Sequence, residues 1–137
     1  MGWQAVKVTA DTNVLVRAIT GDDARQSRIA QRALANADMV SLSVSALCEL
    51  VWVLSRGYKI PVQDIAQAIR RLIESSNVAV NGPAARAGLA MLEAGGDFAD
   101  GVIAYEGKWL GAEAFISFDN RAVELLEAQG HAARLLA

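Results

Sequence analysis

The spacing of apolar and polar residues predicts short strands separated by longer helices. Apolar and β-branched runs too short for helices lie at residues 5–10, 39–43, 77–80 and 114–118, with a weaker run at 132–136. Helical spacing appears over residues 22–37, 44–55, 62–75 and 83–94, and a further helix is expected from Asp97 to about Trp109. This alternation predicts an α/β fold with a central, mostly parallel sheet that helices cover on both faces. The apolar face of the 22–37 helix is predicted to hold Ile29, Ala30, Ala33, Leu34 and Ala37.

Composition indicates a single domain that spans residues 1–137. The chain is 53% apolar and 20% charged, and it contains no visible repeat or linker. Its uncharged stretches are far too short to cross a membrane, and we expect a cytoplasmic protein. Cys48 is the only cysteine, which excludes an internal disulfide, and its apolar neighbours predict a buried, unreactive thiol.

The charge balance restricts how this chain would bind a polyanion. With a net charge of −2 there is no global basic field, so binding would depend on local basic patches or on metal ions. His131 is the only histidine and is expected at the surface, which excludes a metal-free nuclease that uses two histidines as acid and base. No glycine-rich nucleotide-binding motif is present.

Two aspartates directly follow predicted strands. Asp11 comes after the 5–10 run, and Asp119 comes after the 114–118 run. Function in parallel sheets collects beyond the carboxyl ends of the strands, which makes both residues candidates for chemistry. Asp11 is at least equally well explained as a helix N-cap, and Asp119 as a cap or turn residue. The sequence leaves both roles open.

Three further acids are candidates. Glu49 is the only charge in the apolar stretch 39–55, and a carboxylate there must pair, bind metal or reach water. A functional role is favoured over an exposed edge position. Asp97 and Asp100 follow a glycine pair and are expected at the N-cap and N3 positions of a helix, with Asp100 the preferred metal ligand. A purely structural role at the positive helix end is the alternative.

Carboxylates gathered at one crevice would repel each other unless a cation neutralised them. Oxygen ligands without a cysteine pair or a histidine cluster favour Mg²⁺ or Mn²⁺ over zinc. Such an ion binds a substrate phosphate, lowers the pKa of a water molecule and stabilises the charge that develops during attack. Phosphodiester hydrolysis is therefore the expected reaction.

The acids occur within four short motifs: Asp11-Thr12-Asn13-Val14-Leu15-Val16-Arg17, Glu49-Leu50-Val51-Trp52-Val53-Leu54, Asp97-Phe98-Ala99-Asp100 and Ser117-Phe118-Asp119. In this order and spacing, they resemble the four acidic motifs of PIN-domain VapC toxins from bacterial VapBC toxin–antitoxin pairs. The resemblance spans nearly the whole chain.

The resemblance implies a three-layer α/β/α sandwich and Mg²⁺- or Mn²⁺-dependent endoribonuclease activity, with transfer RNA or another structured RNA as the expected substrate. It also implies homodimerisation and inhibition by a VapB-type antitoxin. Carried over by position, the catalytic and metal-binding acids are Asp11, Glu49, Asp100 and Asp119, with Asp97 as an auxiliary acid. Thr12, Asn13 and Ser117 are implied to orient carboxylates or water.

Arginines supply the candidate RNA contacts. Arg25, Arg28 and Arg32 lie at helical spacing on one face of the 22–37 helix, with Arg17 near its start. A solvated helix face explains such a stripe as well as RNA binding does. Arg121 is a further candidate.

Two positions depart from the family pattern. Asn120 separates Asp119 from Arg121, where a basic residue is expected immediately. Gly101 follows Asp100 inside a helix, where alanine is common and costs less conformational entropy. Both departures concern substrate contacts more than the metal site.

Two other function classes remain as alternatives. A phospho-accepting receiver domain would need an acidic pair after the first strand and a lysine after the last, whereas Asp11 has no acidic neighbour and Lys108 precedes the 114–118 strand. A PIN-like scaffold that binds RNA or protein without cleaving is the second alternative. Trp52 and Tyr58 are expected in the core or in a partner groove rather than as platforms for stacked bases.

Overall fold

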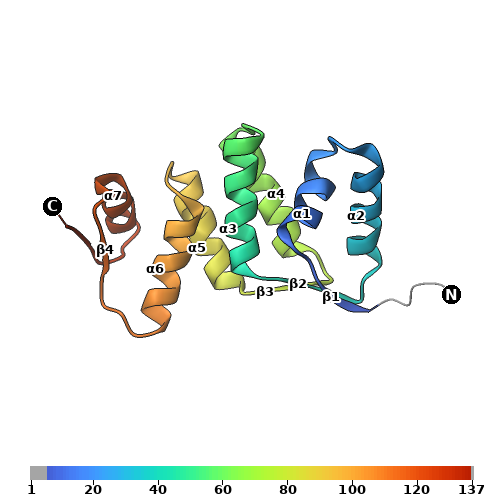
Figure 1. Ribbon diagram of the computed structural model, residues 1–137. Helices are drawn as coiled ribbons and strands as arrows, with labels where there is room; N and C mark the ends of the chain where they lie inside the picture. Colours follow the sequence, from blue (N-terminus) through green and yellow to red (C-terminus); the bar gives the residue numbers. More distant parts are fainter. Residues whose placement is uncertain (1–5, 137) are drawn as a thin grey trace. The chain divides into compact units, whose positions relative to one another are not determined.

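The computed structural model describes residues 6–136, which form two compact units (Figure 1). Unit 1 comprises the chain up to Asn81, and unit 2 begins at Gly82. Each unit consists of parallel strands joined through helices. Within the described range, no helix is both long and apolar enough to cross a membrane.

Unit 1 is built on a parallel sheet with the strand order β1-β2-β3. β2 lies between its neighbours, with Val40 paired to Val8 and Val78, and Val40 and Leu42 are buried. The side chain of Asn77 donates hydrogen bonds to the carbonyls of Leu34 (2.8 Å) and Ala37 (3.1 Å), which closes the end of α2. The elements of unit 1 are β1 (Lys7–Thr9), α1 (Thr12–Thr20), α2 (Ala24–Asn36), β2 (Met39–Leu42), α3 (Val44–Trp52), the π-helix η1 (Val53–Gly57), α4 (Val62–Glu74) and β3 (Val78–Val80).

Unit 2 pairs two parallel strands and packs them on helices. Phe115 is paired with Ala133, and both pack against a core formed by Met91, Ala104 and Leu126. The elements of unit 2 are α5 (Gly82–Glu93), α6 (Phe98–Trp109), β4 (Phe115–Ser117), α7 (Asn120–Ala128) and β5 (Ala133–Leu135).

The α/β class with parallel strands is confirmed, and each predicted helix and strand occurs close to its expected bounds. The predicted strand at 5–10 begins outside the described residues. The predicted apolar face of α2 is wrong in part, because Ile29 and Ala33 are exposed while Ser27 and Ala30 are buried. Cys48 is half-buried rather than buried.

Glycines allow α5 and α6 to pack closely in unit 2. A Cβ on Gly88 would lie 2.7 Å from the ring of the fully buried Phe98, the first residue of α6. A Cβ on Gly101 would overlap the carbonyl oxygen of Ala87 and lie 2.9 Å from Met91. Gly101, which departs from the family pattern at the sequence level, is therefore required by helix packing.

The substitution Gly101→Ala is expected to destabilise the protein by about 1–3 kcal/mol, because the added methyl group must push α5 and α6 apart. Gly107→Ala in the same helix is the matched control, since its Cβ would meet only Ala112 at 3.9 Å. That control should be neutral or stabilising by up to about 1 kcal/mol. Urea denaturation of both variants measures the difference, and equal stabilities would contradict the packing argument.

Asp22 lies between α1 and α2, and its carboxylate binds side chains of α1 and of Tyr58, which follows η1. Tyr58 donates to Oδ2 at 2.8 Å, Thr20 donates to Oδ1 at 2.9 Å, and Arg17 pairs with Oδ1 at 3.0 Å. The hydrogen bonds from Tyr58 and Thr20, followed by that from Arg17, lower the pKa of Asp22 from 3.8 to about 2. Tyr58, which we expected in the core or in a partner groove, is exposed and serves as a hydrogen-bond donor.

We expect Tyr58→Phe to raise the pKa of Asp22 toward 3.8, because it removes the largest cause of the shift. The folded pKa is depressed, so this contribution to stability is full above pH 3.8 and is lost as the pH falls toward about 2. An NMR titration of the Asp22 carboxyl carbon tests the shift. Tyr105→Phe in unit 2 is the control and should leave the Asp22 titration unchanged.

Candidate active site

Asp11 lies between β1 and α1 and caps the helix. Its Oδ1 accepts a hydrogen bond from the backbone N–H of Val14 at 3.0 Å, so the N-cap role left open by the sequence is observed. The residue is exposed, and its Oδ2 makes no hydrogen bond to any described residue. Capping therefore fixes the side chain while one oxygen stays available for another ligand.

Asp97 and Asp119 repeat this arrangement in unit 2. Oδ1 of Asp97 accepts from the backbone N–H of Ala99 at 3.2 Å. Oδ1 of Asp119 accepts from the N–H groups of Arg121 at 3.0 Å and Ala122 at 3.3 Å. Ser117 accepts a hydrogen bond from the Asp119 backbone N–H at 2.9 Å, so it orients the main chain of this acid.

Asp100 differs from the capping acids because it is half-buried in the first turn of α6. Burial raises its pKa, and the negative charges of Asp97 and Asp119 raise it further. The three acids therefore interact electrostatically within unit 2. This interaction concerns only acids of unit 2, and the predicted convergence of all the acids at one crevice stays a prediction.

A pair of glycines brings the first turns of α6 and α7 together. A Cβ on Gly96 would lie 2.8 Å from Leu125 of α7 and 2.9 Å from the Met91 methyl group. Gly95, with φ at +95°, adopts a conformation that side chains disfavour, and its Cβ would lie 2.8 Å from Nη2 of Arg121. This tight contact explains how Asp119 comes close enough to affect Asp100.

Glu49 is exposed on α3, opposite the buried residues Leu47, Leu50 and Val51. Glu49 therefore occupies the exposed position that the sequence disfavoured, because the helix turns this residue toward solvent. Trp52, three residues further along, is 64% exposed and does not belong to the core. Glu49 is accessible to ligands, and its catalytic role stays a prediction.

The remaining polar candidates of unit 1 differ in whether their side chains already bind another residue. Thr12 and Asn13 form the first turn of α1, but the Asp11 carboxylate is held by the Val14 amide instead. Arg17 forms an ion pair with Asp22, so its charge is already partnered.

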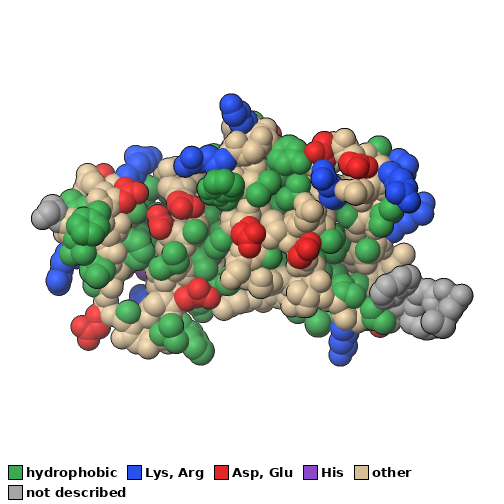
Figure 2. All heavy atoms as spheres, in the orientation of Figure 1, with side chains coloured by type: hydrophobic (Ala, Val, Ile, Leu, Met, Phe, Trp, Pro, Cys, Tyr) green, Lys and Arg blue, Asp and Glu red, His purple; other side chains and the backbone are tan. Residues whose placement is uncertain are grey.

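Basic side chains gather over α2, as Figure 2 shows. The stripe of Arg25, Arg28 and Arg32 is exposed on the side of α2 opposite its buried residues, Ser27 and Ala30. The structure thus leaves three cationic side chains of this helix accessible to an anionic partner.

The donor chemistry of these acids fits a hard divalent cation. Oxygen ligands from Asp97, Asp100 and Asp119 are expected to favour Mg²⁺ or Mn²⁺, and the mutual repulsion at Asp100 is what a bound cation would relieve. Within the described part of the chain, no three His, Cys, Asp or Glu side chains are already grouped closely enough to hold a metal ion. Side-chain rearrangement would have to accompany metal binding in unit 2.

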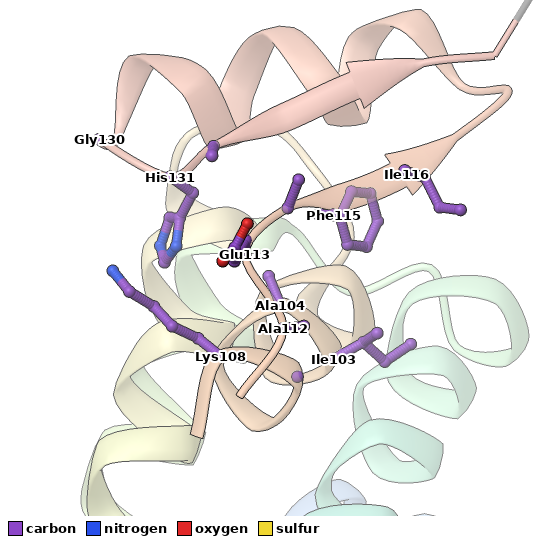
Figure 3. Close-up of a pocket in the computed structure, with 12 residues that line it drawn as sticks. Ile103, Ala104, Lys108, Ala112, Glu113, Phe115, Ile116, Gly130 and His131 are labelled. Atoms are coloured by element: carbon purple, nitrogen blue, oxygen red, sulfur yellow. The ribbon is translucent and has the colours of Figure 1, made fainter. Parts of the chain in front are cut away.

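A cavity of about 420 Å³ lies at the opposite ends of β4 and β5 (Figure 3). It is lined in part by Lys108, Glu113 and Phe115, together with His131, which is half-buried rather than fully at the surface. These residues lie before or at the start of the strands, whereas Asp119 follows the end of β4. The cavity is thus separate from Asp97, Asp100 and Asp119.

Parallel strands define an α/β protein, and two of them, β1 and β4, are followed by a capping aspartate and a helix. The family model of the PIN domain matches residues 8–127, and the chain belongs to the PIN domain family. Its members are typically metal-dependent nucleases, which supports a hydrolase that uses divalent metal. The receiver-domain alternative is set aside by this assignment. No curated protein matches the chain.

Asp100→Asn is expected to raise thermal stability at neutral pH in metal-free buffer. The folded pKa of Asp100 is raised, so the stability contributed by its protonated form is present below pH 3.8 and lost as the pH rises through the folded pKa. The gain should therefore vanish below pH 3.8. Thermal melts across pH measure the effect, with the exposed Glu127→Gln as control. A less stable Asp100→Asn protein at neutral pH would contradict the crowding of the three acids.

Proposed function

We propose that this protein is a Mg²⁺- or Mn²⁺-dependent endoribonuclease and the toxin of a VapBC-type toxin–antitoxin pair. The observation that carries the proposal is that Asp97, Asp119 and the half-buried Asp100 lie at two helix starts of unit 2, where the charges of the first two raise the pKa of the third. Acids that repel each other in this way are expected where a cation completes the site. Membership of the PIN family supports nuclease chemistry.

In the proposed reaction, Asp11, Glu49, Asp100 and Asp119 are the catalytic and metal-binding acids, and Asp97 is auxiliary. The bound ion lowers the pKa of a water molecule and stabilises charge on the phosphate. Asp11, Asp97 and Asp119 each present a second oxygen in a direction fixed by capping. Ser117 holds the backbone of Asp119 in place.

The proposed substrate is transfer RNA or another structured RNA. The exposed stripe of Arg25, Arg28 and Arg32 supports RNA binding, because arginines without acidic neighbours on a helix attract phosphates. A VapB-type antitoxin and a second copy of the chain are the proposed protein partners. Exposed Trp52 and Trp109 are suited to such contacts, since large aromatic side chains contribute strongly at interfaces.

The direct test incubates structured RNA with protein that has been unfolded and refolded to remove any bound antitoxin. Cleavage is expected with Mn²⁺ and not with EDTA, and Asp100→Asn or Asp11→Asn should reduce the rate by about 100-fold or more. Asp64→Asn, which alters an exposed acid in the first turn of α4, is the matched control and should cleave normally.

The same samples report metal binding independently of cleavage. Mn²⁺ should raise the melting temperature of the wild-type protein and of Asp64→Asn, but not that of Asp100→Asn. A refolded protein that neither cleaves RNA nor gains stability from Mn²⁺ would instead be a PIN-like scaffold. Cleavage that persists in Asp100→Asn would refute the proposed site.

A further inference from the structure

Arg121 lies in the first turn of α7, where its backbone contacts Asp119 and its guanidinium lies beside Gly95. Its backbone N–H donates to Oδ1 of Asp119 at 3.0 Å. Its guanidinium reaches the Gly95–Gly96 turn, where a Cβ on Gly95 would lie 2.8 Å from Nη2. Because Asp97 follows this turn directly, the guanidinium of this α7 residue lies beside the turn that leads into α6.

The charge of Arg121 is not used within the described residues. Its side chain is exposed and makes no hydrogen bond or ion pair with any of them. Arg17, by contrast, is held by Asp22 at 3.0 Å. An exposed arginine whose guanidinium forms no ion pair with the described residues is available for an anion that arrives from outside.

We propose that Arg121 binds the non-bridging oxygens of the RNA phosphodiester that is cleaved. The inference rests on the proposed function and adds a catalytic residue to its site. The hydrogen bond to Asp119 holds the backbone of Arg121 in position, and the guanidinium occupies space that a side chain at Gly95 would fill.

The chemistry of the side chain suits this role. A guanidinium presents parallel N–H donors that match two phosphate oxygens, and it stays protonated throughout the reaction. Arg121 therefore transfers no proton and stabilises negative charge on the phosphate by hydrogen bonding. A lysine can supply the charge but not the paired donors.

The experiment compares wild type, Arg121→Gln and Arg121→Lys, with Arg134→Gln as the control for loss of an exposed arginine in the same unit. RNA binding is measured in EDTA over a range of salt concentrations, and cleavage is measured with Mn²⁺. Arg121→Gln should reduce the slope of log affinity against log salt by about 0.7–0.9, the value for one lost phosphate contact. It should also reduce kcat by about 100-fold.

Arg121→Lys should recover the salt slope but only part of kcat, while melting temperatures and the Arg134→Gln protein stay at wild-type values. The inference would be overturned if Arg121→Gln kept the wild-type salt slope and the wild-type kcat. It would also be overturned if kcat fell only together with the melting temperature, because the loss would then reflect unfolding. If the wild-type protein cleaves no RNA, the proposed nuclease function fails, and the salt slope alone then decides whether Arg121 contacts phosphate.

Discussion

The attachment of aspartates to helix N-termini is the constraint on which the rest of the candidate site depends. Asp11, Asp97 and Asp119 each use one carboxylate oxygen to satisfy backbone N–H groups that the helix itself leaves unpaired. Capping removes rotational freedom from the side chain, and the positive helix end favours its negative charge. A structural requirement thus places acidic oxygens after β1, after β4 and at the start of α6.

Close helix packing turns separate caps into an interacting group in unit 2. Gly88 and Gly101 let α6 approach α5, while Gly95 and Gly96 let the start of α7 approach the start of α6. The consequence is electrostatic, because Asp100 is partly removed from water and exposed to the charges of its neighbours. Without a bound cation, the repulsion at Asp100 lowers the stability of the folded protein. Carboxyl groups with perturbed pKa values are common at functional sites.

The distribution of charge bears on an apparent conflict between the composition and the proposed function. A chain with a net charge of −2 does not attract RNA by its overall field. Cations are instead concentrated locally, in the α2 arginine stripe and at Arg121. Arg17, by contrast, forms an ion pair with Asp22. It is therefore less available to bind an anion than the arginines of α2, although it lies near them in the sequence.

The sequence by itself determined the alternation of strands and helices and the positions of the acids at strand ends, because both follow from local periodicity and capping preferences. It could not determine which side of a helix meets the core. Ile29 was expected to face the core, and for Glu49 an exposed edge position was disfavoured, yet both are exposed, since burial depends on which neighbours pack against the helix. Only the tertiary structure decided that Gly101 is needed for a helix contact and that Arg121 reaches Gly95, because both facts depend on distances between elements remote in sequence.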